Sequence, residues 1–214
     1  MCIGAIIAVS RDSTAMHDSP DSLRLEIAAA AARLIADSGL DYGSAKLKAA
    51  RQLLGGGPAP RGVMPDGDEV DEALREHLAL FDPEHDERVA RRRRVAAELM
   101  TWLAEFQPYL TGSVWKGICA EHAPIHLQLF HDNVKEVEMH LLDERLKFEV
   151  LTMPHFRDSH DSVEALAFEW RNEPVLVSLY PEVDLRGALR RAGAIRAERG
   201  DLSALRALER GEAR

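Results

Sequence analysis

The sequence predicts an α+β protein in which a helical N-terminal part precedes a small mixed sheet with flanking helices. Two observations favour this class. Through most of the first 106 positions, apolar residues recur at spacings of three and four, the period of a helix with one buried face. Beyond Pro108 the pattern changes to alternation, as in Ile125, Leu127 and Leu129, which indicates a strand with two different faces.

The helical N-terminal part is expected over residues 21–54. Asp21 can cap its first helix and Gly39 can end it. A second helix is expected from 44 to 54. The segment 55–67 then concentrates glycine and proline, the composition of a linker. We therefore predict a domain boundary in this segment.

The second domain is expected over residues 68–182, including its leading helices. The predicted elements are helices at 68–80 and 83–106, a strand at 125–130, a helix at 132–145, a strand at 146–153 and a hairpin formed by 167–170 and 174–180. The run Arg91–Arg94 lies inside a helix, so its side chains point around the cylinder, which favours solvated arginines over one basic patch.

Both ends of the chain are expected to lie outside these domains. Residues 1–20 are expected to be a disordered tail or an over-extended start, because a polar stretch precedes the first helix signal. Residues 183–214 are rich in arginine and interrupted by glycines, which favours a polar helical tail that is partly frayed.

Composition excludes several classes of partner. Thirty-six acidic residues against 27 Lys and Arg give a net charge of −9, so a general attraction to nucleic acid or anionic lipid is not expected. The apolar stretch 1–9 lacks a basic n-region and is far below the ~20 residues that span a bilayer, so no membrane or export role is expected. Two cysteines, Cys2 and Cys119, are too few for a disulfide framework and are typical of the cytoplasm.

The most informative segment runs from Thr111 to Leu127. It holds a Gly-Ser pair at 112–113 and a further glycine at 117. Because glycine has no Cβ, the backbone at position 112 can approach a triphosphate, while the Ser113 hydroxyl and the first amides of the following helix can donate hydrogen bonds. Lys116 lies within one turn and adds a positive charge.

This segment resembles the signature of the polymerase β-type nucleotidyltransferase superfamily, in which a strand ends in Gly-Ser, a short helix carries a further glycine and the next strand carries Asp-hydrophobic-Asp. The spacing matches without a gap, and the resemblance covers about residues 85–182. The whole layout is also similar to a bacterial group of nucleotidyltransferase-family proteins. The resemblance implies a nucleoside triphosphate bound by Gly112, Ser113, Lys116 and Gly117, Mg²⁺ as cofactor, and a protein, an RNA or a small molecule as acceptor.

The metal-binding half of that signature is replaced. In the family, aspartates hold two magnesium ions that align the attacking oxygen and neutralise phosphoryl charge, which requires anionic oxygen ligands. Pro124 and His126 stand at two of the aspartate positions, and the best match for the third is Leu176. Imidazole prefers softer metals than Mg²⁺, so His126 with Glu149 or Glu169 would be a poor magnesium site. Two hypotheses follow: a nucleotidyltransferase with a degenerate metal site, or a non-catalytic binding or regulatory module on the same fold.

Other functions find less support in the residues. Cys119, His122 and His126 match no standard zinc-finger spacing. A DNA-reading helix-turn-helix needs a recognition helix directly after the basic helix at 44–54, where the linker stands instead, so DNA binding is not expected. The glycine run does not end in the Gly-Lys-Ser/Thr of a P-loop, and Ser113 lacks the Gly-x-Ser-x-Gly elbow of a hydrolase.

Overall fold

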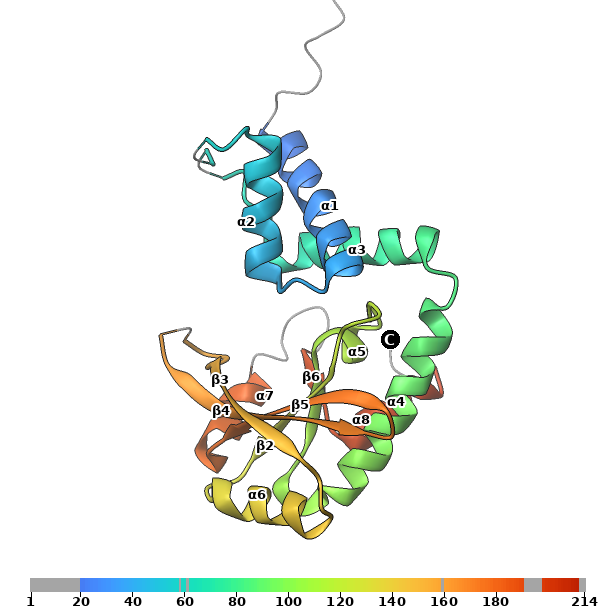
Figure 1. The fold of residues 1–214 in the computed structure, drawn as a ribbon, viewed down its shortest axis with the longest axis vertical. Coiled ribbons are helices and arrows are strands. Elements are labelled where there is room, and N and C mark those ends of the chain that lie inside the picture. The colour runs from blue at the N-terminus through green and yellow to red at the C-terminus, as the bar shows by residue number, and fades with distance from the viewer. Residues whose placement is uncertain (1–19, 58, 61, 159, 191–197, 212–214) are drawn as a thin grey trace, which may run out of the picture. The chain divides into compact units, whose positions relative to one another are not determined.

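The computed structural model of the chain describes residues 20–57, 59–60, 62–158, 160–190 and 198–211, and it confirms the α+β class (Figure 1). The expectation for the first 19 residues lies outside this part. The chain divides into two compact units, Met1–His77 and Leu78–Arg214. In the ranges that the structure describes, no helix has both the length and the apolar character needed to cross a membrane.

The first unit is helical, as the sequence predicts. Its elements are α1 (Pro20–Ser38), α2 (Tyr42–Leu53) and most of α3 (Gly67–Phe81), up to His77. The Asp41 side chain caps α2 by accepting the Ser44 N–H at 3.0 Å. The division between the units falls inside α3 rather than in the segment 55–67, because two contacts hold the start of α3 in the first unit. The Tyr42 hydroxyl donates to Asp71 at 2.6 Å, and Arg24 pairs with Glu69 at 2.9 Å.

The second unit contains a sheet with helices around it. Its elements in chain order are α4 (His85–Trp102), η1 (Ala104–Phe106), β1 (Tyr109–Thr111), α5 (Gly112–Lys116), β2 (Ile125–Phe130), α6 (Val134–Asp143), β3 (Phe148–Pro154), β4 (Ser162–Trp170), β5 (Glu173–Tyr180), η2 (Glu182–Asp184), α7 (Leu185–Arg190), β6 (Arg199–Gly200) and α8 (Leu202–Glu209).

The sheet is mixed and has the strand order β3-β4-β5-β2-β1-β6. Strands β2 and β5 run parallel, and the other neighbours are antiparallel. The predicted hairpin forms between β4 and β5, with Arg171 and Asn172 both at positive φ, as a two-residue turn requires. Strand β4 begins at Ser162, five residues before the predicted start, because small residues such as Ala165 and Ala167 weaken the apolar alternation there.

The two faces of the sheet differ in chemistry. One face carries Leu127 of β2 and Val177 of β5, which pack in one core with Leu99 of α4 and Leu141 of α6. The opposite face, here called the polar face, includes the side chains of His126, Gln128, Ser178 and Arg199. These residues alternate with the core residues, so the strand pattern itself separates the two faces.

The C-terminal segment contributes more structure than the sequence suggests. Instead of a frayed tail, its described residues include strand β6, which pairs with β1, and helix α8, whose Leu205 is fully buried in the main core. Alternation cannot reveal a strand of two residues, and one buried leucine gives little helical periodicity. This correction places Arg199 of β6 on the polar face.

We predict that Leu127→Ala lowers the free energy of unfolding of the second unit by about 2–5 kcal/mol, because the side chain is fully buried at the centre of the sheet. The matched variant Leu80→Ala removes the same atoms from a side chain that is 76% exposed. We expect it to change the free energy of unfolding by about 0.5 kcal/mol or less. All three tryptophans lie in the second unit, so urea unfolding followed by tryptophan fluorescence measures the difference. Equal costs for the two variants would contradict the assigned core.

Candidate functional site

The Gly-Ser pair lies at the turn from β1 into α5. Gly112 has φ +70°, a left-handed conformation that favours glycine. A Cβ at this position would lie 3.6 Å from the Cβ of His126 and 3.8 Å from its Nδ1. The turn therefore sits directly against the His126 ring. With five residues, α5 is too short to provide a strong helix dipole, so the geometry of the turn matters more than the helix end.

The other residues of the motif spread around α5. Ser113 is half-buried in its first turn, and Lys116 is exposed at its end. Gly117 ends the helix at φ +70°, and a Cβ there would come within 3.1 Å of the Arg93 guanidinium on α4. Gly112 and His126 are thus brought together, with Ser113 next along the chain, while Gly117 serves the packing of α5 on α4.

His126 occupies the predicted strand position on β2. It pairs with Thr111 of β1 and with Leu176 of β5. Its Nε2 lies 2.9 Å from the Ser178 hydroxyl. Burial, and then the nearby charge of Arg199, lower the pKa of His126 to about 4, so the ring is neutral at pH 7.

Arg199 supplies a buried positive charge on the polar face. Its guanidinium donates through Nη1 to Gln128 and pairs through Nη2 with Glu198 at 3.2 Å. The Arg199 side chain is 5% exposed whereas that of Glu198 is 49% exposed, so solvent screens the carboxylate of this pair. Among the described residues the Nε of Arg199 has no partner. A buried donor in this state favours an anion or another acceptor beside it.

Neither predicted acidic residue lies beside His126. Glu149 is in the same row of the same face, but β3 is three strands from β2, which puts its Cα about 14 Å away at the usual strand spacing. Glu169 pairs with Pro174, two positions along β5 from Leu176, and lies on a strand two places from β2. The register therefore separates these carboxylates from the histidine by more than the reach of their side chains.

The donor set at this place does not fit Mg²⁺. Pro124 and Leu176 carry no ligand atom, and His126 offers a neutral nitrogen that already contacts Ser178. Over the ranges that the structure describes, no group of three or more His, Cys, Asp or Glu residues could hold a metal ion. Cys119, the cysteine considered as a zinc ligand, is buried, and its Sγ lies 2.9 Å from Nη1 of Arg92.

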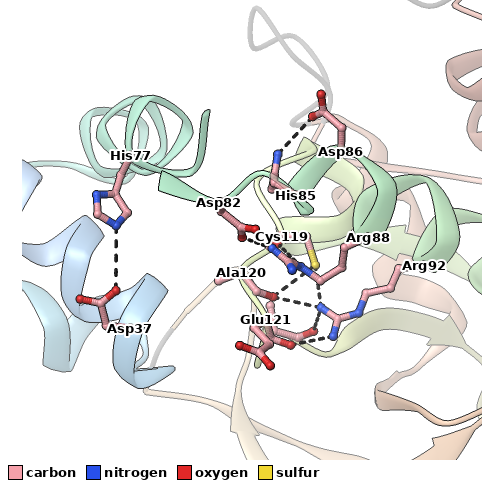
Figure 2. A network of polar contacts seen from close by, with 11 residues as sticks. Asp37, His77, Asp82, His85, Asp86, Arg88, Arg92, Cys119, Ala120 and Glu121 are labelled. Atoms are coloured by element: carbon pink, nitrogen blue, oxygen red, sulfur yellow. Dashed lines mark hydrogen bonds and ion pairs between the residues drawn. The ribbon is translucent and has the colours of Figure 1, made fainter. Parts of the chain in front are cut away.

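Three arginines of α4 hold the backbone that leads from α5 to β2, and we call Arg88, Arg92 and Arg93 the arginine clamp. Figure 2 shows Arg88 and Arg92 directed at the carbonyls of this loop. The clamp donates to six carbonyls, at 2.7–3.1 Å: Val114, Trp115, Cys119, Ala120, Glu121 and Ala123. None of these carbonyls belongs to a strand: Val114 and Trp115 lie in α5, and the other four lie in the loop after it. The guanidinium groups therefore supply donors to backbone acceptors that no strand ladder satisfies.

Two arginines of the clamp have carboxylate partners: Arg88 pairs with Asp82, and Arg92 pairs with Glu173 at the start of β5. Its two carboxylate oxygens accept from Nε of Arg91 and Nε of Arg92, both at 2.7 Å, and its side chain is 7% exposed. Burial raises the pKa of Glu173, but the hydrogen bonds from Arg92 and Arg91 outweigh it and hold the pKa below the usual value. The interpretation of the Arg91–Arg94 run as solvated is therefore wrong for Arg92, although the side chains do point around the helix.

Comparison of the chain with protein-family models, with curated proteins and with solved structures finds no match. The resemblance to polymerase β-type nucleotidyltransferases thus stays a prediction from the residues of 85–182. The strand, turn, short helix and strand from Tyr109 to Phe130 agree with the order of elements that the resemblance implies.

We predict that Arg92→Ala lowers the free energy of unfolding by about 3–5 kcal/mol, because it removes the buried partner of one Glu173 carboxylate oxygen and the donor to several loop carbonyls. The exposed neighbour provides a matched control: Arg94→Ala is expected to change stability by about 0.5 kcal/mol or less. Urea unfolding at pH 7 measures both, and a loss below about 1 kcal/mol for Arg92→Ala would contradict the role of the clamp.

We predict that His126 makes the protein less stable in mild acid. The folded-state pKa of about 4 lies below the ordinary 6.5, so the unfolded chain binds more protons between these values and stability falls as pH drops from about 6.5 towards 4. His126→Gln, whose amide can still meet Ser178, should lose less stability over this range than the unchanged protein. His122→Gln, at an exposed site, is the matched control. Parallel stability curves for His126→Gln and the unchanged protein would contradict the neutral, buried ring.

Proposed function

We propose that the protein binds a nucleoside triphosphate, with the phosphates beside the Gly112 turn, and that it acts as a non-catalytic binding or regulatory module on a nucleotidyltransferase-like fold. The proposal rests mainly on the buried guanidinium of Arg199. This group is incompletely paired and lies on the same sheet face as His126, in a chain whose net charge is −9.

Three features of the turn support binding of an anionic ligand there. Gly112 takes a left-handed φ of +70° and carries no side chain, so the turn can present its backbone to a ligand without a Cβ in the way. The Ser113 hydroxyl follows directly and is a hydrogen-bond donor of the kind that phosphates accept. Arg199 pairs with Thr111, the residue before the glycine; its guanidinium lies beside Gln128 of β2, and its charge acts on the His126 ring.

The residues favour binding over nucleotidyl transfer. Transfer by two magnesium ions needs anionic oxygens at the three positions taken by Pro124, His126 and Leu176. The alternative carboxylates of Glu149 and Glu169 lie on strands two or three places from β2. The proposal therefore includes a nucleotide ligand but no protein or RNA acceptor and no metal-dependent step.

Calorimetric titration with ATP, GTP, CTP and UTP, with and without Mg²⁺, tests this function, together with an assay for released pyrophosphate. We expect binding heat for at least one nucleotide, no dependence on Mg²⁺ and no pyrophosphate above the protein-free rate. Arg199→Gln and Ser113→Ala should each weaken binding, by roughly tenfold for the arginine, since a charged hydrogen bond is worth about 1.5–3 kcal/mol. Arg186→Gln, at an exposed arginine of α7, is the matched control.

Each outcome of this experiment is decisive. Absence of binding at millimolar nucleotide would overturn the proposal. Binding accompanied by pyrophosphate release would replace it with a transferase. If Arg199→Gln folds normally by circular dichroism and binds nucleotide with unchanged affinity, the ligand does not bind at the polar face.

A further inference from the structure

Strand β3 forms one edge of the sheet (Figure 1). All seven of its residues pair with β4, from Phe148 opposite Phe168 to Pro154 opposite Ser162, without an interruption in the register. On its other side the ladder ends. The outer row of backbone N–H and C=O groups of such a strand is a template for another strand.

The two edges of the sheet differ in their protection. Proteins commonly protect an edge with a very short strand, a bulge, a proline or charged side chains. The β6 edge is two residues long. The β3 edge has seven residues with a single charge, Glu149, and proline only at its end. Two of its central side chains are apolar and solvent-accessible, Val150 at 55% exposure and Leu151 at 39%.

The register determines which backbone groups point outward. The N–H of His155 donates to the carbonyl of Asp161 at 2.8 Å, which continues the β3–β4 ladder by one pair. Because hydrogen-bonded pairs alternate along an antiparallel ladder, the odd-numbered residues of β3 bond to β4. The N–H and C=O groups of Val150 and Thr152 therefore face away from the sheet, together with those of Phe148.

We propose that β3 pairs antiparallel with β3 of a second copy of this chain, around a two-fold axis at Leu151. This register places Val150 opposite Thr152 of the second copy as a hydrogen-bonded pair, and Leu151 opposite its own equivalent. Glu149 then faces Met153 of the second copy, so no two like charges oppose each other across the axis. The strand is thus complementary to itself in backbone and in charge, and the pairing joins two sheets into one.

This charge pattern is what favours a second copy as the occupant. The chain as a whole is acidic, with a net charge of −9, and two copies repel each other over most of their surfaces. The β3 edge concentrates apolar side chains and carries one charge, which the two-fold axis places away from its equivalent. A strand from an unrelated peptide is the competing occupant, and it would leave the protein monomeric when alone.

Sedimentation analysis of the full chain tests the pairing. We expect a concentration-dependent dimer of twice the chain mass of 23.8 kDa. Thr152→Pro removes an outward N–H while leaving the bonds to β4 in place, so it should raise the dimer dissociation constant roughly tenfold or more with an unchanged circular dichroism spectrum. Thr152→Ala keeps the N–H and is the matched control.

Cysteine cross-linking tests the register separately and does not depend on Thr152→Pro folding. In a Cys2→Ser background, Leu151→Cys should form an interchain disulfide on mild oxidation, since the Cα atoms of a non-hydrogen-bonded pair lie about 4.5 Å apart, within disulfide reach. Thr152→Cys should not, because its two equivalents lie about 8 Å apart in this register. A monomer at millimolar protein, or equal cross-linking of the two variants, would overturn the proposal.

Discussion

The buried contact between Arg92 and Glu173 joins three parts of the second unit that are far apart in the sequence. The guanidinium comes from α4, the carboxylate from the start of β5, and the remaining donors of Arg92 hold the loop that enters β2. Strands β2 and β5 run side by side in parallel, so the loop before one strand and the first residue of the other must both be fixed at the same end. A single buried arginine does this, and its position inside α4 ties the helix to the sheet.

The polar face follows from this arrangement. With β2 held in register, His126 meets Thr111 on one side and Leu176 on the other, and its ring lies against the Gly112 turn. Burial keeps the ring neutral, so the positive charge near it comes from Arg199. A buried cation on the same sheet face as the glycine turn is a local exception in a chain whose overall charge is negative.

Sequence patterns predicted the elements that depend on local order. The strand 125–130 has the predicted bounds, and the hairpin turn at Arg171 and Asn172 lies where expected, because alternation and turn chemistry are short-range signals. The site residues contributed by other segments were not predicted. Arg92 and Glu173 are 81 positions apart, so nothing near either residue signals their pairing.

Arg199 could not be predicted as a site residue for the same physical reason. Arg199 belongs to a segment with an arginine-rich, glycine-interrupted composition, and only its pairing with Thr111 across 88 positions turns it into a sheet residue. Glu149 and Glu169 were candidates because they sit on strands, yet their distance from His126 depends on strand order, which alternation does not encode. Local patterns therefore identify the turn, while the sheet topology decides which charges surround it.

Nuclear magnetic resonance of isotope-labelled protein titrated with ATP shows whether phosphates bind at the polar face beside Gly112. We expect the largest shift changes on the backbone amides of Gly112 and Ser113 and on the Nε–H of Arg199. Shift changes confined to residues of the first unit, or no changes at saturating nucleotide, would contradict binding at the polar face.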